Sequence, residues 1–416
     1  MIEPFSRPAR KNPILKTREP TLPPAARSRV ALGLVDGAAH GRFELQRCEA
    51  CGAWQYPPRE ACRACLSVEL EWRDADGAGE IVAETVLRHA QELYFRERTP
   101  WRLGLVRLAE AGVTVLAHLH AACPAPPARV RVETALDRAG GVALVARPDA
   151  ANAPPLREDL KLRDMTCDPR FRKVLVTDGK SAVGQAAVRA LAAAGADIVW
   201  AGEAEPWKAT PGFAALRELP NVTTVPLDVT DTLSVRELAG AIGAKVDILV
   251  NTADHHRPGS LLGRAGVGDA AAEMEVNALG LLRLAQGFGP VMRARGADGA
   301  ASAVAWVNVL SIYALANAPA HGTYGASKAA AHSFAQALRA ELRPGGVRVI
   351  NVFPGPVDDE WSQTILPPKL APDALARAIV GALQGSVEDV YPGDVARDWL
   401  ARSRESRKSL EREVAP

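Results

Sequence analysis

The segment Val174-Leu-Val-Thr-Asp-Gly-Lys-Ser-Ala-Val-Gly184 decides the fold, because it joins an apolar strand to a helix through a glycine-containing turn. Strand and helix patterns alternate from this segment onward. Such alternation predicts an α/β fold, in which a parallel sheet is doubly wound with helices on both faces. The expected strands are 174–176, 198–200, 222–225, 248–250, 303–310 and 348–352, and the expected helices are 186–194, 235–242, 271–293 and 324–342.

Four polar side chains in this half of the chain are candidates for proton transfer. Tyr324 is followed one helical turn later by Lys328, Ser311 stands thirteen residues before the tyrosine, and Asn277 lies further upstream. A free phenol has a pKa of about 10 and is a poor base at neutral pH. A cation at i+4 on the same helix face favours the phenolate, so Lys328 is expected to lower the pKa of Tyr324.

These residues resemble the short-chain dehydrogenase/reductase family over about residues 171–405. The resemblance implies a Rossmann-type domain in which a hydride moves between substrate and nicotinamide while Tyr324 handles the proton. It implies that Ser311 holds the substrate oxygen and that Asn277 anchors a water leading to Lys328. The expected cofactor-binding residues are Thr177, Gly179, Lys180, Val183, Gly184, Glu203, Asp228, Val229, Asn251, Ala253, Tyr324, Lys328, Pro354, Gly355 and Val357.

The phosphate-binding turn departs from the family pattern T-G-x-x-x-G-x-G. Only Gly184 is kept of its three glycines, because Asp178 and Ala182 replace the other two. Glycines let the backbone approach a pyrophosphate, and an acid at Asp178 opposes that ligand by on the order of 1 kcal/mol or more. Asp254 likewise stands where the family pattern N-N-A-G has a glycine. An alternative is therefore a non-catalytic assembly subunit with a degenerate dinucleotide site.

The choice between NAD and NADP depends on two charged residues. Glu203 follows the second strand, one place later than the acid that NAD-preferring members carry. A carboxylate near the ribose disfavours a 2′-phosphate, which favours NAD over NADP. Lys180 argues in the opposite direction.

Two Cys-x-x-Cys pairs predict a metal site in the N-terminal part. Cys48 and Cys51 form the first pair, and Cys62 and Cys65 form the second. Four thiolates at this spacing converge on a tetrahedron, the closed geometry of a structural Zn²⁺ ion. The alternatives are a site that has lost its metal and a redox dithiol pair, although the surrounding Pro-rich ribbon is not the usual redox setting.

The segments Gly41–Gly52, Tyr56-Pro-Pro-Arg59 and Cys62–Cys65 resemble the zinc-ribbon/OB-fold proteins that accompany thiolase-like enzymes. This resemblance covers about residues 33–148 and implies a rubredoxin-like ribbon followed by a five-stranded barrel. It also implies an acyl-CoA substrate and a thiolase-like or hydratase partner. The expected reaction is then the interconversion of a secondary alcohol and a ketone on a hydroxyacyl-CoA or a steroid- or other alicyclic-CoA.

Composition limits the remaining possibilities. The net charge of +2 gives no field that would favour nucleic acid or an anionic membrane. An OB barrel could still bind single strands through aromatic and arginine residues such as Tyr94, Trp101 and Arg102, and this is the weakest hypothesis. No apolar run approaches a membrane span and no secretion signal is present, so a cytoplasmic location is expected.

The sequence also predicts a division into five parts, and the resemblance to the dehydrogenase family implies a homo-oligomer, either a dimer or a tetramer, formed through the two long helices. The barrel strands are expected at 81–87, 103–108, 113–119, 130–132 and 142–146. The parts are a flexible basic arm at 1–28, a zinc ribbon at 29–75, an OB-fold barrel at 76–148, a linker at 149–170 and the dehydrogenase domain at 171–416.

Overall fold

The structure is a computed structural model that describes residues 21–24, 28–297, 302–363 and 365–414. The chain divides into two compact units. The first is built mainly from Thr21–Asp168, and the second from Pro169–Leu383 and Glu388–Pro416. The predicted basic arm at 1–28 falls outside the described residues, apart from 21–24 and 28.

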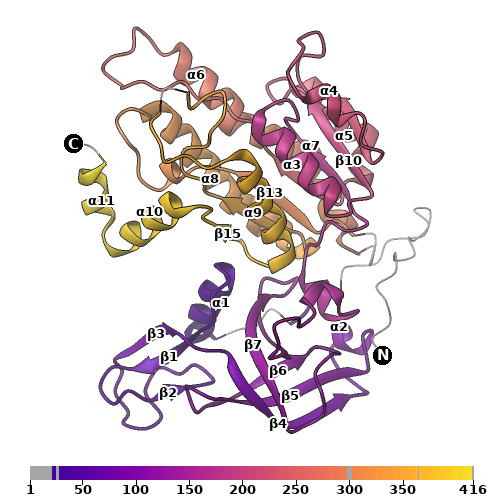
Figure 1. Cartoon of the computed structure of the whole chain (residues 1–416), viewed down its shortest axis with the longest axis vertical. Helices are drawn as coiled ribbons and strands as arrows, with labels where there is room; N and C mark the ends of the chain where they lie inside the picture. The colour runs from indigo at the N-terminus through magenta and orange to yellow at the C-terminus, as the bar shows by residue number, and fades with distance from the viewer. Residues whose placement is uncertain (1–20, 25–27, 298–301, 364, 415–416) are drawn as a thin grey trace. The chain divides into compact units, whose positions relative to one another are not determined.

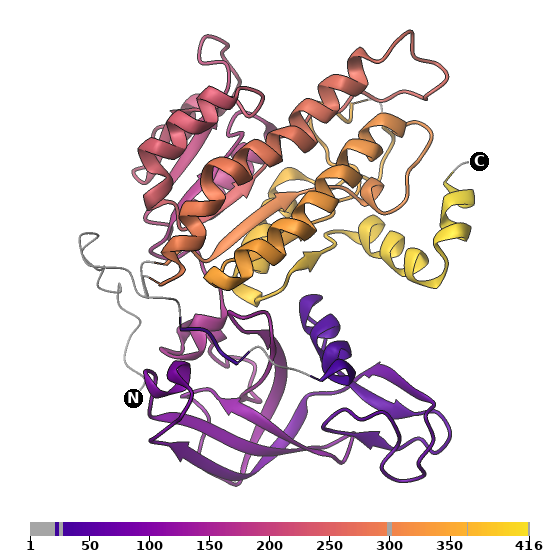
Figure 2. The ribbon, with the colours of Figure 1, turned by 180° about the vertical axis from the view of Figure 1, so that it is seen from behind.

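A seven-stranded parallel sheet forms the centre of the second unit, with strand order β11-β10-β9-β12-β13-β14-β15. Helix α3 lies on one face (Figure 1), and α7 and α8 lie on the other (Figure 2). Buried apolar residues fill the strands, as expected where both faces of a sheet are covered. The predicted doubly wound α/β fold is confirmed. The strands are β9 (Lys173–Val176), β10 (Ile198–Glu203), β11 (Val222–Pro226), β12 (Ile248–Asn251), β13 (Ala305–Val309), β14 (Arg348–Val352) and β15 (Asp389–Val390).

The helices of this unit differ from the prediction at one predicted helix, at the short helix Phe213–Leu216, which the prediction lacks, and beyond residue 352. The single helix expected at 271–293 contains a π-helical turn, Glu275–Leu279, an irregularity that is frequent at functional sites. The elements after residue 352 were not predicted. The helices are α3 (Ala182–Ala193), α4 (Phe213–Leu216), α5 (Thr232–Ile242), α6 (Gly268–Met274), α7 (Gly280–Ala294), α8 (Gly322–Leu342), α9 (Pro372–Gly385), α10 (Asp394–Glu405) and α11 (Arg407–Glu413).

A groove of about 800 Å³ runs between α7 and α8 and is lined mainly by apolar residues. Phe334 and Leu282 contribute partly buried side chains to it. This is the helix pair on which the sequence places an oligomer contact, and that expectation stays a prediction.

The first unit contains a closed five-stranded barrel and a separate three-stranded antiparallel sheet. The barrel order is β4-β5-β6-β8-β7, and the small sheet has the order β2-β1-β3. These are the barrel and the ribbon that the sequence predicts. The elements are α1 (Leu32–Ala39), β1 (Glu44–Cys48), β2 (Trp54–Gln55), β3 (Leu70–Asp74), β4 (Ala78–Leu87), α2 (Leu93–Arg96), β5 (Trp101–Leu108), β6 (Thr114–Leu119), β7 (Ala128–Leu136) and β8 (Val142–Pro148).

The segment expected to be a linker, 149–170, packs against the barrel instead. Leu162 and Met165 are each 2% exposed and belong to the same apolar cluster as Trp101. The carboxylate of Asp159 accepts hydrogen bonds from the backbone N–H groups of Ala121, at 2.7 Å, and of Lys161, at 2.8 Å. The segment therefore extends the barrel core. Its charged and proline-rich composition gives no sign of this packing in the sequence.

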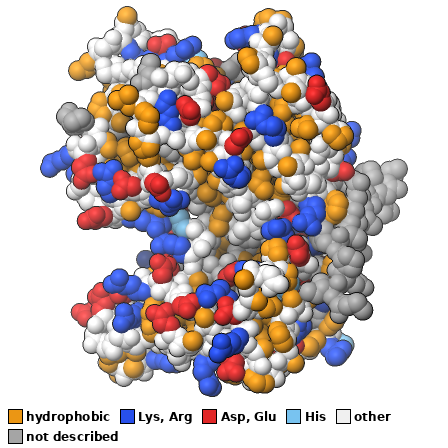
Figure 3. Space-filling model, viewed as in Figure 1, with side chains coloured by type: hydrophobic (Ala, Val, Ile, Leu, Met, Phe, Trp, Pro, Cys, Tyr) orange, Lys and Arg blue, Asp and Glu red, His pale blue; other side chains and the backbone are white. Residues whose placement is uncertain are grey.

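Three residues that the nucleic-acid hypothesis relies on, Tyr94, Trp101 and Arg102, have other contacts in the barrel. Tyr94 and Trp101 are 2% and 1% exposed, so their rings are unavailable for stacking. Arg102 forms an ion pair with Glu84 at 2.8 Å. Acidic and basic side chains are interspersed over the visible face of each unit (Figure 3), in agreement with the small net charge.

Among the described residues, every helix is too short or too polar to cross a membrane.

Candidate active site

The site lies at the carboxyl ends of β12, β13 and β14, the edge at which open α/β sheets bind ligands. Tyr324 and Lys328 extend from the first two turns of α8, and Ser311 lies two residues after the end of β13. Tyr324 is 6% exposed, Ser311 3% and Lys328 2%. The phenol and Ser311 line one cavity, and Lys328 lies beside it, where its Nζ donates to the backbone oxygen of Val309 at 3.2 Å.

Asn277 lies in the π-helical turn and is only 3% exposed. Its Nδ2 donates to the backbone oxygen of His255 at 2.8 Å and to Ser327 Oγ at 2.9 Å. Its Oδ1 accepts from the N–H group of His255 at 2.9 Å. The amide therefore fixes the chain that follows β12, and its role as a water anchor stays a prediction.

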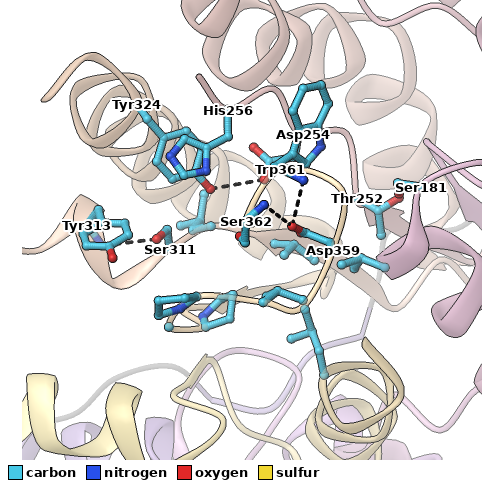
Figure 4. Close-up of a pocket in the computed structure, with 18 of the residues that line it drawn as sticks. Ser181, Thr252, Asp254, His256, Ser311, Tyr313, Tyr324, Asp359, Trp361 and Ser362 are labelled. Atoms are coloured by element: carbon cyan, nitrogen blue, oxygen red, sulfur yellow. Dashed lines mark hydrogen bonds between the residues drawn. The ribbon is translucent and has the colours of Figure 1, made fainter. Parts of the chain in front are cut away.

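Asp254 contacts both members of the Tyr324–Lys328 pair, and Figure 4 shows its hydrogen bond with Tyr324. The phenol of Tyr324 donates a hydrogen bond to Asp254 Oδ2 at 3.1 Å, and Lys328 Nζ lies 3.0 Å from Asp254 Oδ1. Burial and the Asp254 carboxylate raise the pKa of Tyr324 well above its usual value. The expectation that Lys328 lowers this pKa is wrong in this arrangement, because the lysine charge is compensated by Asp254.

Two histidines without a predicted role also surround the phenol. The ring of His256 stacks on Tyr324 with centroids 3.9 Å apart, and its Nε2 lies 3.0 Å from His321 Nδ1. Burial lowers the pKa of His256 to about 4, so this ring is neutral at physiological pH. His256 follows β12 and His321 precedes α8, so their shared position beside Tyr324 follows from the sheet order.

The cavity at this site is small, at about 40 Å³, which leaves room for only a few waters. Its wall includes Trp361, whose ring lies 5.0 Å from that of His255 and 5.2 Å from the guanidinium carbon of Arg257. Asp359, beside it, accepts hydrogen bonds from the N–H groups of Trp361 and Ser362 (Figure 4). The predicted residues Val183, Pro354, Gly355 and Val357 also line this cavity.

The carboxylate of Asp359 is a second acidic group near the phenol. Its pKa is raised to about 6 by burial and by the negative charge of Asp254. The charge of Asp254 therefore reaches Asp359.

The phosphate-binding turn is built as a close contact between β9 and α3. A Cβ added at Gly184 would lie 1.7 Å from the backbone oxygen of Asp178, so only glycine fits this position. The Asp178 carboxylate accepts from the N–H groups of Lys180, at 3.0 Å, and Ser181, at 3.3 Å. Burial raises the pKa of Asp178. A side chain of the protein thus occupies two N–H groups of the turn that joins β9 to α3.

Other predicted cofactor residues support the turn. Thr177 Oγ1 donates to Asn251 Oδ1 at 2.8 Å, which joins β9 to β12. A Cβ on Gly179 would lie 2.8 Å from that of Ala201. Val229 and Ala253 are buried in the main apolar cluster.

Glu203, at the end of β10, is held by two cations. Lys180 Nζ lies 3.2 Å from one carboxylate oxygen and Arg217 Nη2 lies 3.1 Å from the other. Glu203 is 7% exposed, so its oxygens are not free to bind ribose hydroxyls. Asp228, after β11, accepts hydrogen bonds from Thr230 N and Oγ1 at 2.8 and 2.7 Å. Both acids lie outside the small cavity.

The four predicted cysteines of the ribbon converge as a metal site requires. Cys48 and Cys65 have their sulfurs 3.6 Å apart, as do Cys51 and Cys62, and all four sulfurs lie within 4.8 Å of one another. Tetrahedral zinc with Zn–S bonds of about 2.3 Å places sulfurs roughly 3.8 Å apart. The residues therefore fit a structural Zn²⁺ ion.

Comparisons with known proteins identify the family of the second unit. The short chain dehydrogenase family model matches residues 172–369. An uncharacterized oxidoreductase of Staphylococcus aureus is 30% identical over 215 residues, which cover 50% of this chain and 89% of that protein. The short-chain dehydrogenase ptmH of Penicillium ochrochloron is 33% identical over 200 residues, which cover 45% of this chain and 70% of that protein. The chain belongs to the short chain dehydrogenase family and is an oxidoreductase of that type.

A solved structure and two further family models extend this result. A short chain dehydrogenase from Burkholderia cenocepacia, crystallised in complex with NADP, is 31% identical with a TM-score of 0.53, covering 59% of this chain and 98% of that one. In the first unit, residues 35–71 match the ChsH2 rubredoxin-like zinc ribbon domain and residues 72–137 match the ChsH2 C-terminal OB-fold domain. The predicted zinc-ribbon and OB-fold classes are confirmed.

Proposed function

We propose that the protein interconverts a secondary alcohol and a ketone on an acyl-CoA thioester with a nicotinamide cofactor. The observation that carries the proposal is the grouping of Tyr324, Ser311 and Lys328 at the carboxyl edge of the sheet. Tyr324 exchanges the proton with the substrate oxygen, Ser311 orients that oxygen, and Lys328 contributes a buried positive charge.

The second unit retains groups suited to a dinucleotide. Helix α3 starts at Ala182, so the N–H groups of its first turn lack partners within the helix and favour a pyrophosphate. When bound, the nicotinamide would supply or accept the hydride. Because the cavity measures about 40 Å³, Trp361 and its neighbours must move to admit the ring.

NADP, rather than NAD, is the cofactor that we propose. The sequence favours NAD through Glu203, but this carboxylate already pairs with Lys180 and Arg217. Two cations against one anion leave a surplus positive charge, which suits the 2′-phosphate that distinguishes NADP. The Burkholderia cenocepacia relative, in complex with NADP, is consistent with this choice.

Replacing Arg217 by alanine is expected to weaken NADP binding about tenfold or more while leaving NAD binding nearly unchanged, because only NADP carries the 2′-phosphate. Calorimetric titration with both cofactors measures this. Arg236→Ala, at an exposed position on α5, is the matched control. Equal losses for NAD and NADP would contradict the assignment of Arg217 to the 2′-phosphate.

The acyl-CoA substrate is proposed from the N-terminal ribbon and barrel. Their resemblance to proteins that accompany thiolase-like enzymes supports either direct binding of the acyl-CoA or recruitment of a thiolase-like or hydratase partner. A secondary alcohol one step before thiolytic cleavage fits both roles. The structure assigns no residue to the CoA moiety.

Reduction of a 3-ketoacyl-CoA with NADPH tests this proposal. We expect turnover with the CoA thioester and a kcat/KM at least about tenfold lower with the N-acetylcysteamine thioester, which lacks the nucleotide part of CoA. Absorbance of NADPH follows the reaction. Equal kcat/KM values for the two thioesters would rule out recognition of CoA, and absence of turnover with any ketone would reject the redox function.

A non-catalytic assembly subunit is the second candidate, and a specific observation favours it. The carboxylate of Asp178 accepts hydrogen bonds from two N–H groups of the predicted phosphate-binding turn, and the cavity has room for only a few waters. Under this alternative neither NAD nor NADP binds in the calorimetric titration, while the chain still captures a thiolase-like protein. Binding of either cofactor rejects the alternative.

A further inference from the structure

Asp254 is the strongest feature that the proposed function leaves unused. It follows the end of β12 by three residues, and its two carboxylate oxygens have different partners. One accepts the phenol hydrogen bond of Tyr324 at 3.1 Å, and the other lies 3.0 Å from Lys328 Nζ. The carboxylate is about a quarter exposed, whereas Lys328 is almost fully buried.

The hydrogen-bond direction fixes which form of Tyr324 is favoured. A carboxylate can only accept, so the phenol must carry its proton to make this bond. Loss of that proton would place a phenolate 3.1 Å from a carboxylate. The repulsion between these two negative charges disfavours the phenolate. Lys328 is the cation that would stabilise a phenolate, but its Nζ is committed to Asp254 and to the oxygen of Val309.

The remaining groups around the phenol do not reverse this balance. They come from each element that packs against Tyr324: His256 after β12, His321 before α8, Ser311 and Tyr313 after β13, and Asp359 after β14. Burial lowers the pKa of both histidines, so neither supplies a positive charge at neutral pH. Asp359 adds negative charge, and a hydrogen bond from the hydroxyl of Ser311 acts in the other direction.

We propose that Asp254 is a positioning residue that keeps the Tyr324 phenol protonated at neutral pH and so sets the site to reduce a ketone. This inference rests on the proposed function. In that direction a bound reduced nicotinamide would supply the hydride to the carbonyl carbon. The carbonyl oxygen would take the proton of Tyr324 Oη, and the electrons of the broken O–H bond would stay on the phenolate. The phenolate that remains is then reprotonated from solvent, and the ketone has become an alcohol.

Direct titration of Tyr324 in the cofactor-free full-length protein tests the inference without measuring turnover. The chain has five tyrosines, so ¹³Cζ-tyrosine spectra are simple, and Tyr324→Phe assigns the signal. In the wild type the Tyr324 signal should remain that of the neutral phenol beyond pH 10. In Asp254→Asn the pKa should fall by about 1 to 3 units, because Lys328 then acts on the phenol alone.

Two further variants keep the titration decisive. Asp254→Gly introduces the residue that the family pattern has at this position and replaces Asp254→Asn if that variant fails to fold. Asp359→Asn removes the neighbouring carboxylate that does not bond the phenol, and a smaller shift is expected. Ionisation of wild-type Tyr324 below pH 10, or equal shifts in Asp254→Asn and Asp359→Asn, would overturn the role of Asp254.

The pH profile of alcohol oxidation provides the functional readout. Oxidation needs the phenolate, so its kcat/KM should fall about tenfold per pH unit below the pKa of Tyr324. In Asp254→Asn this limb should move to lower pH by the same amount as the titration. A wild type without turnover would defeat the proposed function but leave the titration as an independent test. A titration shift without any movement of the kinetic limb would contradict the link between Asp254 and reaction direction.

Discussion

Replacing Tyr324 by phenylalanine should lower NADPH-dependent ketone reduction by about 10²- to 10⁴-fold, the usual contribution of a positioned general acid. The hydroxyl that donates the proton is lost, while the ring that packs against His256 is retained. The phenylalanine cannot make the hydrogen bond to Asp254 Oδ2. The Asp254–Lys328 ion pair should persist, because it uses the other carboxylate oxygen. Steady-state rates together with NADP affinity separate a catalytic loss from a binding loss.

Tyr313→Phe is the matched control for this prediction. Tyr313 lines the same cavity, and its ring centroid lies 6.4 Å from that of Tyr324. Burial raises the pKa of Tyr313 to about 12, so its hydroxyl is a weaker acid than an ordinary phenol. We expect its removal to change the rate by less than about tenfold. Comparable losses of rate in the two variants would show that removal of any hydroxyl from this cavity lowers the rate. That result would contradict the assignment of Tyr324 as the proton donor.

Replacing one ribbon cysteine by serine, as in Cys62→Ser, should abolish zinc binding and unfold the small β2-β1-β3 sheet. The reason is that binding of a structural zinc contributes on the order of 10 kcal/mol or more to small ribbons, which have little core of their own. The wild type should contain one zinc per chain, and the variant less than about a tenth of that. Elemental analysis gives the metal content, and hydrogen exchange over Glu44–Cys48 and Leu70–Asp74 reports the unfolding.

Cys123→Ala is the control for the zinc prediction. Cys123 is 4% exposed and packs in the barrel core, where its Sγ donates to the oxygen of Ala146 at 3.2 Å. Its replacement should lower the stability of the barrel but keep the zinc content. A Cys62→Ser protein with full zinc, or a wild-type ribbon that stays protected from exchange after chelation, would refute a structural metal at the four cysteines.

The features that could be predicted from the sequence are those that local patterns encode. The alternation that begins at Val174–Val176 predicts a doubly wound sheet, because strands covered on both faces are uniformly apolar and helices between them are amphipathic. The spacing of Cys48, Cys51, Cys62 and Cys65 predicts their convergence, because each pair forms a turn of fixed geometry. The packing of 149–170 was missed, since Leu162 and Met165 are isolated among charged residues and show no period.

The residues of the candidate site could be predicted from the sequence. The charge contacts among them could not. Asp254 was recognised as a departure from the family glycine, but its contact with Tyr324 joins positions 70 residues apart. A signal was available, because Asp254 follows β12 and Tyr324 lies beyond β13, and these strands are neighbours in the sheet. Likewise, the sequence favours NAD if the carboxylate of Glu203 is free to meet the ribose. In the fold this carboxylate is paired with Arg217 and Lys180.

The sequence by itself therefore determined the folds of both units, the four cysteines and the grouping of Tyr324 with Lys328 on one helix face. Only the tertiary structure places Asp254 against that tyrosine, in a buried setting that raises the pKa of the phenol. The physical reason is that a pKa depends on every charge within a few ångströms and on the loss of water around the group. Those conditions arise only when the ends of β12, β13 and β14 bring Asp254, Tyr324 and Asp359 together.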